Sequence, residues 1–219
     1  STQQKIEYRP FLVKEQKILM MALETQDEKA ILKSIVDTIE SCVTTELDVQ
    51  ALTTFDIEYL FTQIRAKSVG EQAKVNLKCG ECEKDTEVEI PLDEVKINLT
   101  NIDKKIKLND QYTVLMKYPN FKAILLAPED KKGDSLTEAI LDLVIMCMDK
   151  LQTEDEQIEF QNENNQSIND FLESLNTKQF EKLVHFANNL PKLTHKVNYT
   201  CEHCKKENQI TLSGIQDFF

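Results

Sequence analysis

The sequence predicts an α+β protein, mostly helical, in which helices pack around a discontinuous, zinc-ribbon-like pair of β-hairpins. Three observations predict this fold. Apolar residues recur at helical spacing through the first third of the chain and again beyond Pro119. Two other stretches alternate apolar and polar residues, as strands do. Each of these stretches contains a Cys-x-x-Cys motif, so the pair offers four thiols to one metal ion.

Composition limits the classes of protein that need to be considered. The 219 residues are 41% hydrophobic and 29% charged, which is typical of a globular protein. No apolar run is long enough to span a membrane, and the first residues lack the apolar core of a signal peptide, which favours the cytosol. The net charge of −12 disfavours nucleic-acid binding, which needs a basic face.

Three amphipathic helices are predicted before residue 70. The first begins after Pro10, and Asp27 is placed to cap the second. The third runs from about Phe55 to Ser68, with Gly70 at its C-cap. Each helix should pack an apolar face on another element. The residues of these faces are Phe11, Glu15, Ile18, Leu19, Ala22 and Leu23; Ile31, Ile35, Ile39 and Cys42; and Ile57, Leu60, Phe61 and Ile64.

Strands are expected from about Ala73, where the apolar period changes to two. A hairpin surrounds the first cysteine pair, and a further β-like stretch runs from Val95 to Met116 with a polar insert around 101–105.

Helices return after this stretch. Ser135 and Glu138 form a capping box for a helix that is predicted to continue through Leu151. The acidic segment 152–166 is expected to be an exposed loop, with a short hairpin as the alternative. Two more helices are expected near 167–175 and 177–189, and a second hairpin at 194–212.

These elements are expected to form a single compact domain, residues 1–219. Its parts are an N-terminal helical part at about 8–70, a zinc-ribbon part at 73–92 plus 194–213, intervening strands at about 95–118, and a second helical part at 119–190.

The two hairpins are copies of one unit. Residues 74–82 align without gaps to residues 196–204 at a constant offset of 122 positions, and the match continues to Ile90 with Leu212. Two residues between cysteines let a tight turn point both sulfurs at one ion, so two such knuckles complete a tetrahedral site. We therefore predict one structural Zn²⁺ per chain. Its ligands are Cys79, Cys82, Cys201 and Cys204.

The same four cysteines could serve other chemistry. Redox dithiols or disulfides remain alternatives, although no thioredoxin-like βαβ pattern surrounds either pair. Four thiolates leave no open position for water, which disfavours a catalytic zinc. His203 is interpreted as exposed, and Cys42 and Cys147 as buried apolar residues. His185 and His195 have no partner constellation in the sequence.

Motifs for catalysis are missing from the sequence, which contains no glycine-rich phosphate loop, no Gly-x-Ser-x-Gly elbow and no His-Glu-x-x-His helix. We therefore expect no enzymatic activity.

The strings at 7–11 and 14–19 resemble the opening of the baseplate hub assembly family of T-even-type contractile-tailed phages. The strings at 55–61 and 64–71 are also similar to that family, and there too they lead into a Cys-x-x-Cys knuckle, as here at Cys79.

The resemblance implies a protein that acts in assembly of the central hub of the tail baseplate, as an assembly factor (chaperone) or as a hub component. Its partners would be phage baseplate hub proteins, and it would act in the host cytoplasm during assembly, with the virion baseplate as the second location. No catalytic residue carries over. Arg9 and Arg65 could pair with carboxylates such as Glu15 or Asp56, or bind a partner, and the terminal Phe218 and Phe219 could do either.

A zinc-ribbon nucleic-acid-binding adaptor is the alternative function. The only candidate patch for phosphates consists of Lys74, Lys78, Lys84, Lys196, Lys205 and Lys206. Oligomeric state and the identity of the hub partners are left open by the sequence.

Overall fold

The structure is a computed structural model that describes residues 4–25, 27–98, 102–125 and 136–214. Their contacts divide the chain into two compact units, residues 1–99 with 191–219 and residues 100–190. Each unit combines helices with antiparallel strands, which confirms the α+β class. The expectation of one compact domain stays a prediction, because such a division does not test whether the units fold independently. Ser135, Phe218 and Phe219 lie outside the described residues.

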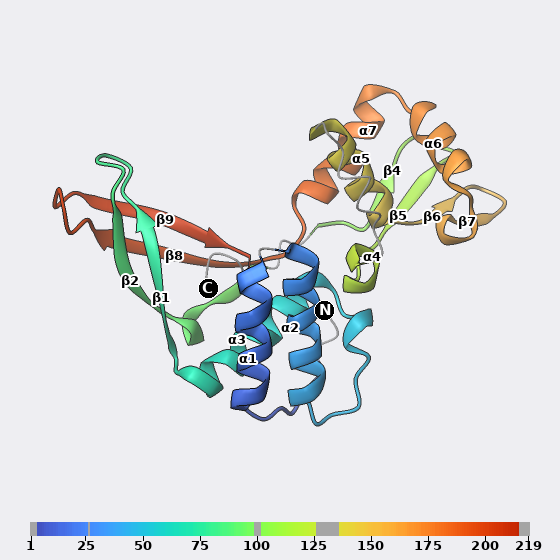
Figure 1. Cartoon of the computed structure of the whole chain (residues 1–219). Helices are drawn as coiled ribbons and strands as arrows, with labels where there is room; N and C mark the ends of the chain where they lie inside the picture. Colours follow the sequence, from blue (N-terminus) through green and yellow to red (C-terminus); the bar gives the residue numbers. More distant parts are fainter. Residues whose placement is uncertain (1–3, 26, 99–101, 126–135, 215–219) are drawn as a thin grey trace. The chain divides into compact units, whose positions relative to one another are not determined.

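The first unit contains three helices and two long hairpins (Figure 1). Its helices are α1 (Val13–Thr25), α2 (Glu28–Cys42) and α3 (Thr54–Val69), with 3-10 turns η1 (Val49–Ala51) and η2 (Leu92–Glu94). Its strands are β1 (Gln72–Lys78), β2 (Asp85–Pro91), β3 (Lys96–Asn98), β8 (Lys192–Thr200) and β9 (Glu207–Ser213). β1 pairs with β2, and β8 lies between β3 and β9.

The predicted helix boundaries of this unit are close to those observed. The Asp27 side chain accepts the Lys29 amide and caps α2, and Gly70 ends α3 with φ +129°. The predicted core residues of α3 are all buried, and Ile35, Ile39 and Cys42 of α2 are buried too.

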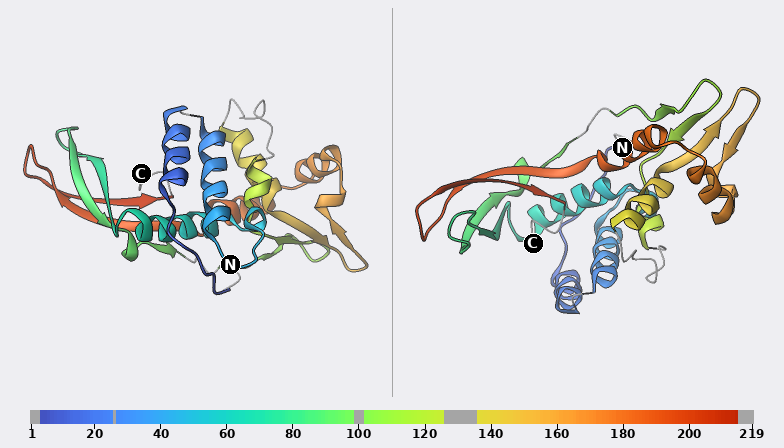
Figure 2. Two further views of the ribbon diagram at one scale, coloured as in Figure 1. Left: turned by 60° about the horizontal axis from the view of Figure 1, so that its bottom comes forward. Right: turned by 90° about the horizontal axis from the view of Figure 1, so that it is seen from above.

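The predicted apolar face of α1 is confirmed only in part. Glu15 of this face is buried and Leu19 and Ala22 are half-buried, but two of its apolar members are exposed. Glu15 is the residue of α1 that the structure buries, whereas Ile18 and Leu23 are 53% and 49% exposed. The reason is that α1 packs along one side against α2, which in turn contacts α3, so that the two helices project from α3 (Figure 2). Helical spacing therefore identified the helix but not how much of its surface is covered.

The buried Glu15 forms the predicted ion pair with Arg9, at 2.9 Å between Nη2 and Oε1. Its other carboxylate oxygen accepts the Leu12 amide at 2.8 Å. Burial alone would raise the pKa of Glu15. The hydrogen bonds from Arg9 and Leu12 lower it by more than burial raises it, and the resulting pKa is about 2. The suggested pairing of Arg65 with Asp56 stays a prediction.

The two hairpins bury one face of each against the other and against α3. Alternate residues of β1 are buried, as a two-residue period requires, and the register places Val75 opposite Val88. The buried members of this cluster are Ala66, Ala73, Val75, Leu77, Ile90, Leu92, Val95, Leu193, Val197, Tyr199 and Leu212. The core thus holds the two hairpins side by side and aligns their turns (Figure 1).

The second unit packs helices on a four-stranded sheet of order β4-β5-β6-β7. Its helices are α4 (Phe121–Leu125), α5 (Leu136–Cys147), α6 (Asn165–Glu173) and α7 (Thr177–Asn188), with the 3-10 turn η4 (Phe160–Asn162). Its strands are β4 (Lys105–Lys107), β5 (Thr113–Met116), β6 (Met148–Gln152) and β7 (Gln157–Glu159). Its own core includes Val114, Val144, Leu183 and Phe186.

Two expectations for this unit change. The predicted helix does not continue through Leu151, because α5 ends at Cys147 and the chain becomes strand β6 between β5 and β7. Pairing on both sides satisfies the backbone of this segment, and tertiary context thereby overrides its helical spacing. The segment after β6 contains the short hairpin partner β7, the alternative considered for 152–166.

Candidate metal centre

The first knuckle lies in the turn between β1 and β2. The Cys79 amide donates to the Lys84 carbonyl at 3.0 Å, and the Glu83 amide donates back to the Cys79 carbonyl at 3.0 Å. Glu83 adopts φ +56°, the left-handed conformation that lets a chain reverse in so few residues. This turn directs the sulfurs of Cys79 and Cys82 to the same side.

The second knuckle, between β8 and β9, repeats these contacts. The Cys201 amide donates to the Lys206 carbonyl at 2.9 Å, and the Lys205 amide donates to the Cys201 carbonyl at 3.0 Å. Lys205 has φ +60° and corresponds to Glu83 at the offset of 122. The internal repeat of the sequence is therefore a repeat of backbone geometry.

The four sulfurs form one cluster in which all lie within 4.8 Å of one another. Two of the approaches join opposite hairpins, 3.6 Å from the Cys79 sulfur to that of Cys204 and 3.6 Å from the Cys82 sulfur to that of Cys201. Four thiolates about 2.3 Å from a tetrahedral ion would be about 3.8 Å apart. The sulfurs are thus already spaced as ligands of a single ion, and all six cysteines of the chain are free thiols.

Thr86 supports this cluster from β2. Its hydroxyl donates to the Cys201 sulfur at 3.6 Å and accepts the Glu202 amide at 3.4 Å. The side chain is only 3% exposed, so these contacts satisfy a buried hydroxyl. Cys201 and Glu202 both belong to the opposite hairpin, so Thr86 orients the sulfur of a cysteine that is distant from it in sequence.

Asn208 makes the reciprocal contacts from β9. Its amide nitrogen lies 3.6 Å from the Cys79 sulfur, and its side-chain oxygen accepts the Gly80 amide at 3.2 Å. It stands 122 positions after Thr86, so each hairpin supports the other through the same position of the repeat. This exchange relates the two knuckles by an approximate twofold symmetry. Sequence reasoning missed both residues, although the offset would have paired them.

The electrostatics of the cluster favour a bound cation. Backbone amides of Cys82 and Glu81 lower the pKa of Cys79, and the Cys204 amide is the main cause that lowers the pKa of Cys201 to about 6. The Lys206 amide lowers the pKa of Cys204, but burial and the neighbouring sulfurs raise it to about 12. Thiolates this close repel one another, so ionising all four requires a positive ion among them.

A model of the family described as "T4 bacteriophage base plate protein" matches residues 1–219. The chain belongs to this family. The comparisons with curated proteins and with solved structures gave no match. The resemblance read from residues 7–19 and 55–71 is therefore confirmed at the level of a T4-type baseplate protein.

The remaining cysteines of this baseplate protein are not near the cluster's sulfurs within the described residues. Cys42 and Cys147 are each 0% exposed, as predicted, and burial raises the pKa of both, that of Cys147 to about 12. His203 is exposed, also as predicted, and its Nε2 lies 3.2 Å from the Asp85 carbonyl of the opposite hairpin. The Tyr199 hydroxyl forms a further hydrogen bond between the two hairpins by donating to the Lys78 carbonyl at 2.8 Å.

Two of the six hairpin lysines are paired with carboxylates. Lys74 pairs with Glu87 at 2.8 Å and Lys206 pairs with Glu81 across the two knuckles. These ion pairs neutralise two of the amines on which phosphate binding would depend.

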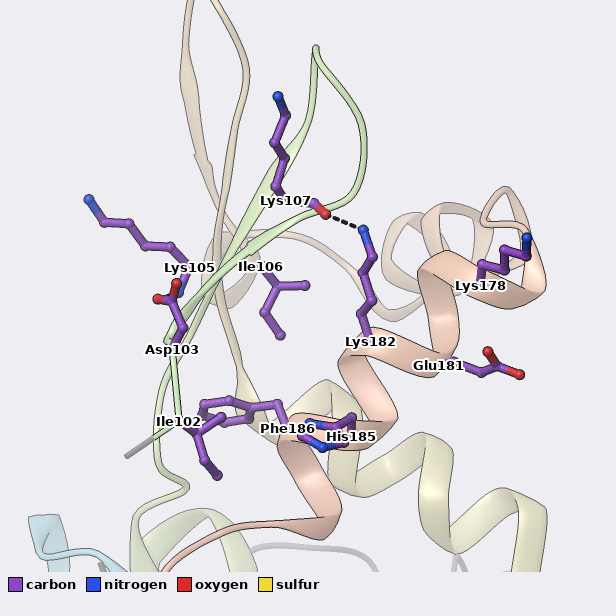
Figure 3. A pocket seen from close by; sticks show the side chains of 10 residues that line it. All are labelled: Ile102, Asp103, Lys105, Ile106, Lys107, Lys178, Glu181, Lys182, His185 and Phe186. Carbon is purple, nitrogen blue, oxygen red and sulfur yellow. Dashed lines mark hydrogen bonds between the residues drawn. The ribbon is translucent and has the colours of Figure 1, made fainter. Parts of the chain in front are cut away.

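The second unit of the baseplate protein has an open groove of about 590 Å³ between β4 and α7 (Figure 3). Ile102, Ile106 and Phe186 give it an apolar floor, and the Lys182 ammonium donates to the Lys107 carbonyl across it at 2.6 Å. His185, which had no partner in the sequence, lies at its edge beside lysines and carboxylates. The apolar floor suits the groove better to contact with apolar groups than to acid–base chemistry.

Proposed function

We propose that this chain acts in assembly of the central hub of the tail baseplate, as an assembly factor or as a hub component, through protein–protein contacts and without catalysing a reaction. The family match over residues 1–219 is the observation that carries the baseplate role. The strings at 7–19 and 55–71, which resemble the hub assembly family, support the hub as its place of action.

We further propose that one Zn²⁺ binds the four clustered cysteines and has a structural role. Zinc takes four thiolates in tetrahedral geometry, and the sulfur separations of 3.6 Å suit that shell. The ion would join two turns that are distant in sequence and already contact each other through Thr86 and Asn208. All four positions are filled by sulfur, so the ion would supply rigidity and no bound water for catalysis.

A deletion phage tests the function. Cells infected with phage lacking this gene should accumulate baseplate precursors without a hub, and the intact gene supplied in trans should restore tails. A tagged chain should co-purify with hub proteins. Mass spectrometry of finished particles then separates the two roles, because a hub component remains in virions and an assembly factor does not. Normal tails in the deletion infection would refute the proposal.

The zinc proposal has its own test, independent of infection. Protein purified under reducing conditions should contain about one zinc per chain by elemental mass spectrometry. A ratio near zero in a folded preparation would rule out the metal. Binding of DNA or RNA with a steep salt dependence, lost on charge reversal of Lys78 and Lys196, would instead favour the nucleic-acid adaptor.

A further inference from the structure

Exposed apolar side chains concentrate on one helix. In the described parts of the chain, ten large apolar residues are exposed, and six of them lie within residues 12–23. These six are Leu12 (56%), Val13 (79%), Ile18 (53%), Met20 (56%), Met21 (57%) and Leu23 (49%). At 100° per residue, Leu12, Ile18 and Leu23 lie within 80° of the buried Glu15, whereas Val13, Met20 and Met21 share the opposite side. Single exposed apolar residues are ordinary, but a group on one side of a helix marks an interaction surface.

The surroundings of α1 explain the exposure. It contacts α2, and the two helices project from α3 as a pair in both views of Figure 2. A helix of 13 residues is marginal by itself, and its stability in a protein comes from packing. Among the described residues, α2 covers one side of α1, and Val13, Met20 and Met21 on the other side are exposed.

The outer side of α1 carries a stripe at heptad spacing. At 100° per residue, the direction opposite the buried Glu15 contains Val13, Lys17, Met20 and Glu24, with Met21 beside them. Lys17 and Glu24 are both exposed. Val13 and Met20 thus alternate with Lys17 and Glu24 at the spacing of a paired-helix seam, where a charged residue costs stability but specifies the register and the partner.

The order of charges in the stripe selects the partner. The midpoint between Met20 and Met21 is also the midpoint between Lys17 and Glu24. The two charged residues therefore lie at equal distances from it along the helix axis, about 5 Å on either side. Two copies of α1 that pair antiparallel about this midpoint therefore place Lys17 of each opposite Glu24 of the other. Parallel pairing would place like charges together. The stripe is complementary to itself under a twofold axis, the symmetry of most homodimers.

We propose that α1 is a homodimer contact, in which two copies of this chain pair their α1 helices antiparallel with Met20 and Met21 at the twofold axis. Methionine suits this position because its flexible side chain adapts to a facing surface. With α2 of each copy behind α1, the contact completes a four-helix layer that buries the exposed stripe. This inference goes beyond the hub role and does not depend on it.

Sedimentation equilibrium of the purified full-length chain tests the contact. Wild type should dimerise reversibly, and Met20→Glu with Met21→Glu should leave a monomer, because the substitutions place like charges at the axis. Ile210→Glu is the matched control, since it changes an exposed apolar residue of β9, and it should not alter the dimer. A wild-type chain that stays monomeric throughout the accessible concentration range overturns the proposal. This holds even if another baseplate protein is found to bind α1.

A charge exchange tests the antiparallel register. Lys17→Glu and Glu24→Lys should each weaken self-association about tenfold, because two ion pairs worth a few tenths to 1 kcal/mol each become repulsions. A mixture of the two variants should form a heterodimer at least as tight as the wild-type dimer, since every facing pair is again of opposite charge. Dimers that withstand both single changes, or a mixture that stays monomeric, contradict the register.

Discussion

Cys201→Ser is the sharpest test of how the proposed zinc stabilises the first unit. Cys201 is 0% exposed, and its sulfur lies 3.6 Å from that of Cys82. The 118 residues from 83 to 200 separate these two ligands, so the ion closes a long loop that includes the whole second unit. A serine hydroxyl is a poor ligand for zinc compared with a thiolate, and we expect the ion to be lost.

The expected magnitude follows from the loop. A cross-link that closes a loop of this length removes about 5 kcal/mol of chain entropy from the unfolded state. For a chain of this size, 5 kcal/mol corresponds to a decrease of about 10–20 °C in melting temperature. The melting transition of the first unit should decrease, while that of the second unit, which has its own core, should change little.

Differential scanning calorimetry and elemental analysis of the same samples check this. Cys147→Ala is the control, because it removes a buried thiol outside the cluster and should lower stability while keeping one zinc per chain. The reasoning is refuted if the Cys201→Ser chain keeps its zinc, or if it loses zinc and melts at the wild-type temperature.

Three further predictions concern single contacts. Thr86→Val keeps a buried side chain of similar size but removes the hydrogen bond to the Cys201 sulfur, and zinc affinity measured by chelator competition should decrease about 10–100-fold; an unchanged affinity would contradict the supporting role. Glu15→Gln should destabilise the chain at neutral pH but not near pH 2. The pKa of Glu15 is about 2 in the folded chain and about 4.3 in the unfolded chain, so the ionised carboxylate stabilises the fold above pH 4.3. This stabilisation is lost as the pH falls from about 4.3 to about 2. Urea midpoints from pH 2 to 7 measure this, and a constant difference between variant and wild type would be evidence against it. Gly70→Ala places a side chain at φ +129° with no heavy atom within 4 Å, so backbone strain alone should cost about 1–3 kcal/mol in urea unfolding; a neutral effect would show that the turn relaxes.

Local patterns predicted most of the first unit. Asp27 and Gly70 mark helix ends because they satisfy or permit backbone conformations within a single turn. The two-residue period of β1 reports which face is buried, and the repeat at an offset of 122 predicted that both hairpins share one turn geometry. Such features depend on neighbours in sequence, so the sequence alone reveals them.

Long-range packing accounts for the failures. Residues after Cys147 have helical spacing, but two neighbouring strands pair with them and make β6. Ile18 and Leu23 of α1 were predicted to pack but are exposed, because spacing shows that a helix has an apolar side, not whether the chain provides a surface to cover it.

The four cysteines show the same division. By itself the sequence determined which residues form the site, since the spacing of two residues in each knuckle directs paired sulfurs to a common point. Only the tertiary structure decided that the pairs meet at 3.6 Å across two hairpins, and that Thr86 and Asn208 each support the opposite knuckle. The physical reason is that a turn is specified by a few adjacent residues, whereas the meeting of two turns depends on the shared core of Leu77, Ile90 and Leu212 beneath them.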